Sequence, residues 1–135
     1  MRGIFWLVVL LGVDQIVKFF MIKFANHLVT KNPGFVFGFV AGFPGLLMAA
    51  IILILIFVVY ANRFSSFFSA NRGSFYLLLA GGISNLLDRF WRGYVVDYIH
   101  IRSWPAFNLA DIMIILAGVI IIINMFGLNP LRRRR

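Results

Sequence analysis

The sequence predicts an all-α membrane protein with four transmembrane helices, both termini in the cytoplasm, and a small strand-containing or interfacial outer loop. Hydrophobic residues make up 62% of the 135 residues and charged residues 13%, whereas soluble domains average about 45–50% and about 25%. The apolar residues form long runs, and basic residues flank these runs. An aqueous protein of this size cannot enclose so much apolar surface, so a lipid-embedded chain is expected.

We predict four spans within a single integral membrane domain that comprises residues 1–135, at about residues 3–22, 46–60, 74–90 and 109–126. A helix needs about 20 apolar residues to cross a hydrocarbon core of about 30 Å. We expect the first run to be retained as a span and not cleaved as a signal peptide. It contains Asp14, and no small-residue cleavage site follows it.

The basic residues predict the orientation, because Lys and Arg are enriched in cytoplasmic loops. With four spans, seven basic residues share the side of the termini and four share the other side. The seven are Arg2, Arg63, Arg72, Arg132, Arg133, Arg134 and Arg135, and the four are Lys23, Lys31, Arg92 and Arg102. Both termini are therefore expected in the cytoplasm. This topology accounts for the net charge of +9, so nucleic acid is not an expected partner.

The two outer loops are the longer ones. In the first, at residues 23–45, the turn-forming run Asn32–Gly34 precedes phenylalanines that alternate over residues 35–39. This alternation indicates a short strand or an interfacial segment. In the second, at about residues 91–108, Trp104-Pro105 supplies a break at which the chain can turn back, because proline does not continue a helix without loss.

The acidic residues are the most informative feature. All four, Asp14, Asp88, Asp97 and Asp111, lie in or beside predicted spans. A charge at the bilayer centre costs at least ~2.5 kcal/mol, so such carboxylates usually face the protein interior and have a function. In the predicted topology all four lie in the outer half of the membrane, which favours a site that faces outward.

Asp97 and Asp111 are 14 residues apart, which is about 21 Å along one straight helix. They can meet only if the chain turns back between them. Two neighbouring carboxylates in a low dielectric hold one proton between them. Such a pair can activate water for peptide hydrolysis without a metal or cofactor. From composition alone, a proton or cation pathway competes seriously with catalysis as an interpretation of this pair.

Other polar residues share helix faces with the carboxylates: Lys18 with Asp14, Asn85 and Arg89 with Asp88, and Asn108 with Asp111. Each set also has a structural interpretation. An i,i+4 pair can merely neutralise charge, Asp88 with Arg89 can brace two helices, and asparagines can join helices by hydrogen bonds. The chain has no cysteine, and its two histidines have no metal-ligand spacing, so no metal site is expected.

Five segments in order resemble the motifs of the bacterial lipoprotein signal peptidases, also called signal peptidase II. The resemblance extends over nearly the whole chain. The segments are Asp14-Gln15 with Lys18, Asn32-x-Gly34 with Phe37, the run from Gly81 to Arg89, Val95-Val96-Asp97-Tyr98, and Phe107-Asn108-Leu109-Ala110-Asp111. Ser84 stands where the family often has glycine.

The resemblance implies an aspartic endopeptidase with Asp97 and Asp111 as its catalytic dyad. Residues implied to bind substrate or support the site are Asp14, Lys18, Asn32, Gly34, Asn85, Asp88, Arg89 and Asn108. The implied substrate is a prolipoprotein that carries diacylglyceryl on a cysteine, cleaved just before that cysteine. The implied location is the bacterial cytoplasmic (inner) membrane, as a multi-pass protein with its active site towards the outer face. We expect no cofactor, contact with membrane lipids, and a monomer.

Two other functions compete with this interpretation. A small proton-coupled transporter or channel subunit also uses intramembrane carboxylates, but it needs a pathway open to both sides. Here the polar residues gather towards one side, and the inner half is apolar apart from flanking arginines. A non-catalytic membrane scaffold would need no carboxylate pair at all.

Overall fold

The computed structural model describes residues 2–33 and 66–126, and this part of the chain is mainly helical with one small sheet. The elements are α1 (Arg2–Phe24), the 3-10 helix η1 (Asn26–Leu28), β1 (Thr30–Asn32), α3 (Ser66–Ala70), α4 (Arg72–Arg92), β2 (Val95–Asp97) and α5 (Leu109–Met125). Helices therefore cover the runs predicted at about residues 3–22, 74–90 and 109–126. The run at 46–60 and the phenylalanines at 35–39 lie outside the described residues.

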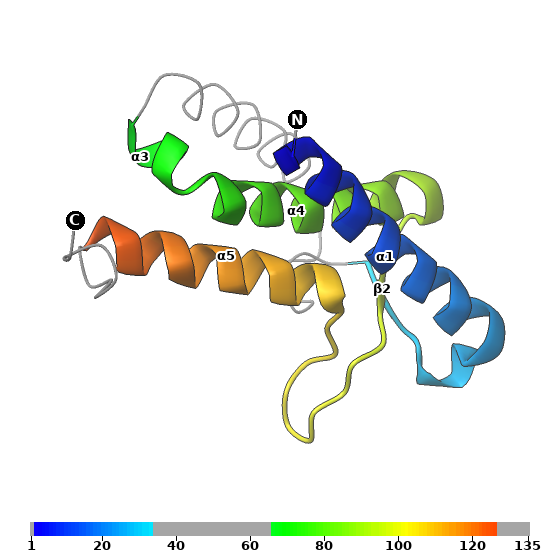
Figure 1. Cartoon of the computed structure of the whole chain (residues 1–135). Coiled ribbons are helices and arrows are strands. Elements are labelled where there is room, and N and C mark those ends of the chain that lie inside the picture. Colours follow the sequence, from blue (N-terminus) through cyan, green and yellow to red (C-terminus); the bar gives the residue numbers. More distant parts are fainter. Residues whose placement is uncertain (1, 34–65, 127–135) are drawn as a thin grey trace.

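Helix α4 lies at the centre of the arrangement and packs against both α1 and α5. Figure 1 shows α4 and α5 side by side, with α1 crossing α4. The end of α1, the end of α4 and the start of α5 lie at the same side of the molecule (Figure 1). The sheet joins the two loops at that side, because β1 pairs antiparallel with β2 and Thr30 lies opposite Asp97. A strand is thus present in the loop that the sequence predicted to be outer, just before the phenylalanines from which it was expected.

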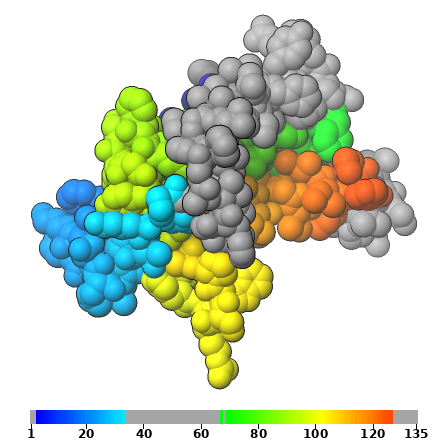
Figure 2. Space-filling view, turned by 180° about the vertical axis from the view of Figure 1, so that it is seen from behind, coloured from blue at the N-terminus to red at the C-terminus, as the bar shows by residue number. Residues whose placement is uncertain are grey.

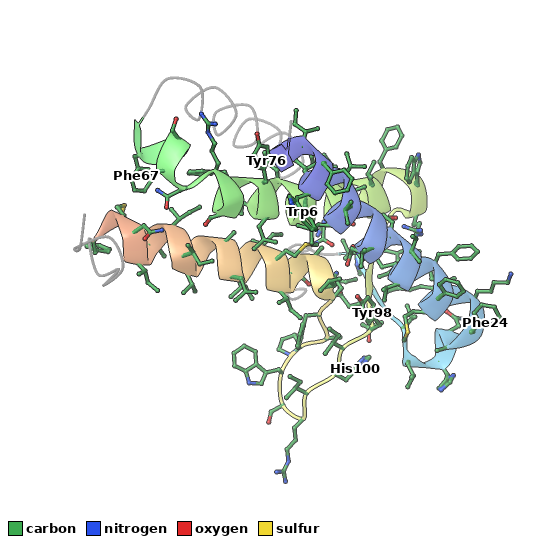
Figure 3. The ribbon with its side chains drawn as sticks, viewed as in Figure 1. Trp6, Phe24, Phe67, Tyr76, Tyr98 and His100 are labelled. Atoms are coloured by element: carbon green, nitrogen blue, oxygen red, sulfur yellow. The ribbon has the colours of Figure 1, made fainter. Side chains whose placement is uncertain are left out.

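Burial is inverted relative to a soluble protein. On α1, Asp14 and Lys18 are fully buried, whereas Phe5 is 62% exposed and Phe24 is 67% exposed. Phe24 points away from the helices (Figure 3). In the described part of the chain, one helix is long and apolar enough to cross a membrane, at Gly3–Phe24, and Leu109–Met125 is a shorter apolar helix. Large apolar side chains directed outwards are stable against lipid but unfavourable in water.

Small residues bring α4 and α5 close together. Ala80, Ala110 and Met113 form the buried cluster between them. A Cβ atom at Gly81 would lie 2.5 Å from the carbonyl oxygen of Ala110. Only glycine fits at this distance, as is common where membrane helices approach closely.

Helix α4 is held at both ends by local features. At its end, Gly93 has φ +77°, and its N–H donates to the Arg89 carbonyl oxygen at 3.1 Å. Glycine adopts this left-handed conformation readily, so the helix can end there and the chain turn into β2. At its start, the Asn71 side chain accepts a hydrogen bond of 2.6 Å from Asn124 of α5. A backbone cap therefore ends α4, and a side-chain hydrogen bond joins its start to α5.

We expect Gly81→Ala to destabilise the protein by roughly 1–3 kcal/mol, because the added methyl group meets backbone and forces the helices apart. Thermal unfolding in detergent measures this as a lower midpoint. Gly73→Ala is the matched control on the same helix, since a Cβ at exposed Gly73 meets nothing within 4 Å. Equal midpoints for the two variants would contradict the close approach of α4 and α5.

Candidate active site

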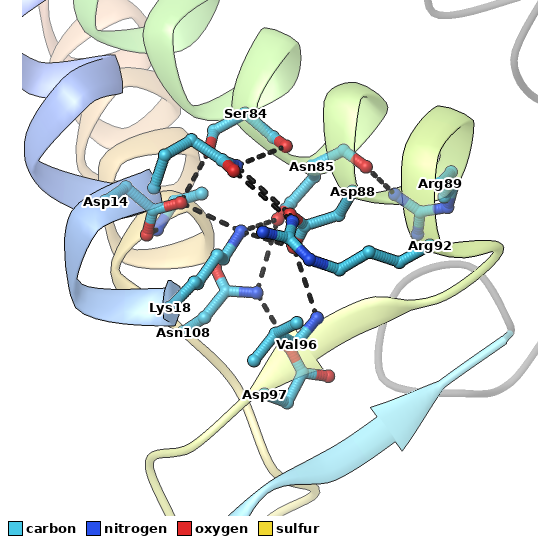
Figure 4. Close-up of polar contacts among 12 residues, drawn as sticks. Asp14, Lys18, Ser84, Asn85, Asp88, Arg89, Arg92, Val96, Asp97 and Asn108 are labelled. Carbon is cyan, nitrogen blue, oxygen red and sulfur yellow. Dashed lines mark hydrogen bonds and ion pairs between the residues drawn. The ribbon is translucent and has the colours of Figure 1, made fainter. Parts of the chain in front are cut away.

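A buried ammonium group lies at the centre of the polar cluster in Figure 4. The Nζ atom of Lys18 lies 2.8 Å from an oxygen of Asp14, 2.9 Å from Asp88 and 3.0 Å from the amide oxygen of Asn85. Three acceptors match the three N–H donors of a lysine side chain. Lys18, Asp14 and Asp88 are all fully buried, so each charge is compensated within the protein interior.

Asp14 connects α1 to both other long helices. One of its oxygens accepts a hydrogen bond of 2.5 Å from the Ser84 hydroxyl of α4. Its other oxygen accepts a bond of 3.0 Å from the backbone N–H of Ala110, in the first turn of α5. A single carboxylate therefore fixes the start of α5 relative to α1 and α4.

Asp88 connects α4 to the sheet. One of its oxygens accepts a hydrogen bond of 3.2 Å from the backbone N–H of Val96 in β2. The other accepts from Gln15 at 3.1 Å and forms an ion pair with Arg92. Asp14 and Asp88 thus face two cations, Lys18 and Arg92, and the formal charge of these four groups is zero.

The first turn of α5 is capped entirely by side chains. The first four N–H groups of a helix have no partner within it. Here Asn108 and Asp111 form a capping box, with bonds of 2.9 and 3.2 Å between side chain and backbone. Tyr98 accepts from the N–H of Leu109 at 3.2 Å, and Asp14 accepts from the N–H of Ala110. Burial raises the pKa of Tyr98 to about 12, so its phenol is neutral.

Asn108 links the two carboxylates that the sequence singled out. Its side-chain nitrogen donates a hydrogen bond of 2.6 Å to Asp97, and its oxygen accepts from the backbone N–H of Asp111. Asp111 also accepts a bond of 2.8 Å from Asn85, and Asp97 accepts one of 2.8 Å from Asn32. The chain does turn back between the two aspartates, since Ile99 and Phe107 form an antiparallel bridge. Both carboxylates are therefore bonded to Asn108, that of Asp97 to its side chain and that of Asp111 to its backbone N–H.

The Asp97 carboxyl, in β2, is buried and has an unusually high pKa. Burial raises its pKa from the ordinary value to about 6, and the negative charge of Asp111 acts in the same direction. The hydrogen bonds from Asn32 and Asn108 oppose this by stabilising the charged form. A carboxyl that titrates near neutral pH can accept and return a proton at physiological pH.

The structure brings together most of the residues selected from the sequence: Asp14, Lys18, Asn32, Asn85, Asp88, Asp97, Asn108 and Asp111 all belong to this one network. Arg89 lies beside it and donates to the Asn85 carbonyl oxygen at 3.0 Å. Gly34 lies outside the described residues. Within the described ranges, no group of three potential metal ligands is suitably placed.

Four members of the network were not selected: Gln15, which was noted only within a motif and bonds Ser84 and Asp88, and Arg92, Ser84 and Tyr98. Arg92 was assigned only to topology, although its i,i+4 spacing from Asp88 could have identified it. Ser84 and Tyr98 were noted only within motifs. Ser84 contacts Asp14, which is far from it in the sequence, and Tyr98 contacts Leu109, which the reversal of the chain brings close. No local sequence signal indicates such partners.

The fold resembles that of a known enzyme. A solved structure described as a bacterial membrane enzyme superposes with a TM-score of 0.82, covering 99% of this chain and 93% of that chain at 24% identity. The described helices and small sheet therefore have the fold of a bacterial membrane enzyme.

The family follows from the sequence comparisons. The family model described as signal peptidase (SPase) II matches residues 6–127. The lipoprotein signal peptidase of Moorella thermoacetica is 39% identical over 101 residues, which are 74% of this chain and 67% of that protein. That of Halothermothrix orenii is 33% identical over 110 residues, covering 78% and 74%. The chain belongs to the signal peptidase II family, a family of peptidases.

We expect Lys18→Met to destabilise the protein by roughly 3–5 kcal/mol, because it leaves two buried carboxylates without their shared cation. Unfolding in detergent at neutral pH measures this loss. Lys23→Met is the matched control on the same helix, because Lys23 is exposed and contacts only the faces of Phe19 and Phe24 in the described structure. A loss no larger than that of the control would show that Lys18 does not hold the cluster together.

Proposed function

We propose that this chain is an intramembrane aspartic endopeptidase that removes the signal peptide from diacylglyceryl-modified prolipoproteins. The observation that carries the proposal is the bonding of two carboxylates to one residue, Asn108: that of Asp97 to its side chain, and that of Asp111 to its backbone N–H. Membership of the signal peptidase II family supplies the reaction class. The named relatives are lipoprotein signal peptidases, which supports the choice of substrate.

The proposed topology is a single domain over residues 1–135 with four spans and both termini in the cytoplasm of a bacterium. The chain would lie in the bacterial inner membrane with its site towards the outer face. Two observations support this. The outward surfaces of α1 and α5 are apolar, with Phe19 53% and Ile122 53% exposed. The polar cluster is built from the second halves of α1 and α4 and the first turn of α5, so in this topology it would lie towards one membrane surface.

In the proposed mechanism, Asp97 and Asp111 share one proton. The charged carboxylate takes a proton from water while the water oxygen attacks the carbonyl carbon of the bond before the lipidated cysteine. The protonated carboxyl gives its proton to the carbonyl oxygen, which yields a neutral tetrahedral intermediate. When this intermediate collapses, the carbon–nitrogen bond breaks. The cysteine amine leaves with a proton from the first carboxyl, and the second recovers its own.

The remaining polar residues would orient this pair. The amides of Asn32, Asn85 and Asn108 donate to the two carboxylates and so limit their rotation. The charged groups beneath them, Asp14, Lys18, Asp88 and Arg89, would support the site. Gly34 is proposed to contribute to substrate binding.

The site's proposed depth matches the chemistry of the substrate. The acyl chains of a diacylglyceryl group stay in the outer leaflet, so the modified cysteine is held near the lipid–water interface. A dyad near the outer end of the helices can meet a bond at that level. One chain supplies both carboxylates, so a monomer is sufficient.

We expect Asp97→Asn and Asp111→Asn each to lower kcat by about 10²–10⁴-fold, because each removes one member of the acid–base pair while nearly preserving shape. The assay follows the size shift of a diacylglyceryl-modified prolipoprotein on a gel. His100→Asn is the control in the same loop: its exposed side chain contacts Thr30, and parental activity is expected. Unfolding midpoints establish that each variant is folded.

The outcomes separate the competing interpretations. If the folded parent leaves the substrate whole, the peptidase proposal fails, and proton-driven flux in liposomes would then support a transporter. If either asparagine variant cuts as well as the parent, the peptidase proposal survives and the assigned dyad is wrong.

We expect kcat/KM to fall as the pH drops below about 6, because the pKa of Asp97 lies near that value and protonation removes the base. Asn32→Ala should move this acid limb to higher pH, because the Asn32 hydrogen bond lowers the pKa of Asp97. Thr30→Ala in the same strand is the matched control and should leave the limb in place. The measured acid limb reports an apparent pKa of the coupled pair Asp97 and Asp111. A limb that stays fixed or moves to lower pH in Asn32→Ala would exclude Asp97 as the titrating group.

A further inference from the structure

A hairpin leaves the molecule directly beside the candidate site. It comprises residues 98–107, here called the outer hairpin, and Asp97 and Asn108 lie at its two ends. The N–H of Ile99 donates to the Phe107 carbonyl oxygen at 2.8 Å, and the return bond is 3.1 Å. At the far end, the N–H of Trp104 donates to the Ile101 carbonyl oxygen at 2.7 Å and closes a turn over residues 101–104, here called the tip.

The tip presents apolar side chains that nothing in the described structure covers. Ile101 is 54% exposed and Trp104 is 67% exposed, with Arg102 and Ser103 exposed between them. Arg102 has φ +28°, a backbone conformation that residues other than glycine adopt at an energetic cost. Tryptophan is enriched at the membrane–water interface, where its ring is partly in lipid and its N–H reaches water.

The hairpin extends sideways from the helices and not onward along their axes. In Figure 1 it leaves the start of α5 and runs away from α4 and α5 to one side, and in Figure 2 it protrudes from the body of the molecule. In the proposed topology, α5 enters the bilayer at about Leu109. A segment that runs sideways from that point follows the plane of the outer surface, so this step rests on the proposed function.

The charge of this region fits a phosphate-bearing surface. Arg102 of the tip and Lys31 of the neighbouring strand are exposed cations. In contrast, the carboxylates of Asp14, Asp88 and Asp97 are buried, and that of Asp111 is bonded within the site. In the described ranges, no exposed acidic residue opposes these cations. Basic residues beside a bilayer are attracted to anionic headgroups.

We propose that the tip docks onto the outer leaflet, with Ile101 and Trp104 in the interfacial layer and Arg102 against lipid phosphate. The occupant is the phospholipid surface of the bilayer that holds the chain. A docked tip fixes the level of the hairpin, and its two ends carry Asp97 and Asn108. The hairpin therefore sets the depth of the dyad relative to the lipid–water interface.

The first measurement uses the fluorescence of Trp104 alone. Trp6→Phe combined with Trp91→Phe leaves one tryptophan, and the protein is reconstituted in vesicles of phosphatidylcholine and phosphatidylglycerol. We expect lipids brominated near the headgroup to quench Trp104 more strongly than lipids brominated near the chain end, and aqueous iodide to quench it several-fold less than free tryptophan. A matched variant that keeps Trp6 instead, within the apolar helix α1, confirms insertion.

Two outcomes would overturn the proposal. If iodide quenches Trp104 as readily as free tryptophan and neither brominated lipid quenches it, the tip projects into water. If Trp104 becomes shielded only when prolipoprotein is added, or only as the protein-to-lipid ratio rises, the tip binds substrate or a second copy of the chain.

A second measurement remains available if the double tryptophan variant does not fold. The chain has no cysteine, so Ser103→Cys accepts a single spin label at the tip, and Ser69→Cys provides an exposed control in α3. We expect the tip label to be more accessible to oxygen than to a water-soluble nickel complex, and the control label to show the reverse. Equal behaviour at both positions would contradict docking. Both measurements report depth without any cleavage assay, so failure of the peptidase proposal would be seen separately.

Discussion

The buried ammonium of Lys18 is the interaction on which the rest of the structure depends. Two fully buried carboxylates, Asp14 and Asp88, could not remain charged in this interior without a cation between them. Their shared contact with Lys18 holds α1 against α4. The second oxygen atoms of the same carboxylates are then available for the start of α5 and for Arg92. The same set of bonds therefore compensates the buried charges and fixes the arrangement of three helices.

The position of Asp111 follows from this arrangement. It lies in the first turn of α5, and the N–H groups of that turn are bonded to side chains from α1, from the loop after β2 and from the turn itself. A helix start held from three directions cannot rotate without breaking several bonds. Fixed orientation of reacting groups before substrate arrives is what acid–base catalysis requires. The tertiary packing of the whole bundle, and not α5 alone, thus determines where Asp111 lies.

Much of this could be predicted from the sequence, because acidic residues within apolar runs are rare and costly. Long apolar runs predicted α1, α4 and α5, and the cost of burying charge selected Asp14, Asp88, Asp97 and Asp111. Partners were harder to predict. A brace between Asp88 and Arg89 was one interpretation of the sequence, and the structure adds ion pairs of Asp88 with Lys18 and Arg92. The caps on α5 also depend on sheet register and on a reversal of the chain, neither of which a local pattern determines.

Charge balance explains why asparagines surround Asp97 and Asp111. Because Asp14 and Asp88 are matched by Lys18 and Arg92, these four groups add no formal charge beneath Asp97 and Asp111, and Arg89 is the further cation beside them. A further cation in contact with Asp97 would hold its carboxyl ionised, and a fully apolar setting would keep it protonated. Amide donors lie between these extremes, since they favour the charged form without supplying a charge. Two such donors on Asp97, opposed by burial, give a pKa of about 6, a value at which one proton can pass in either direction.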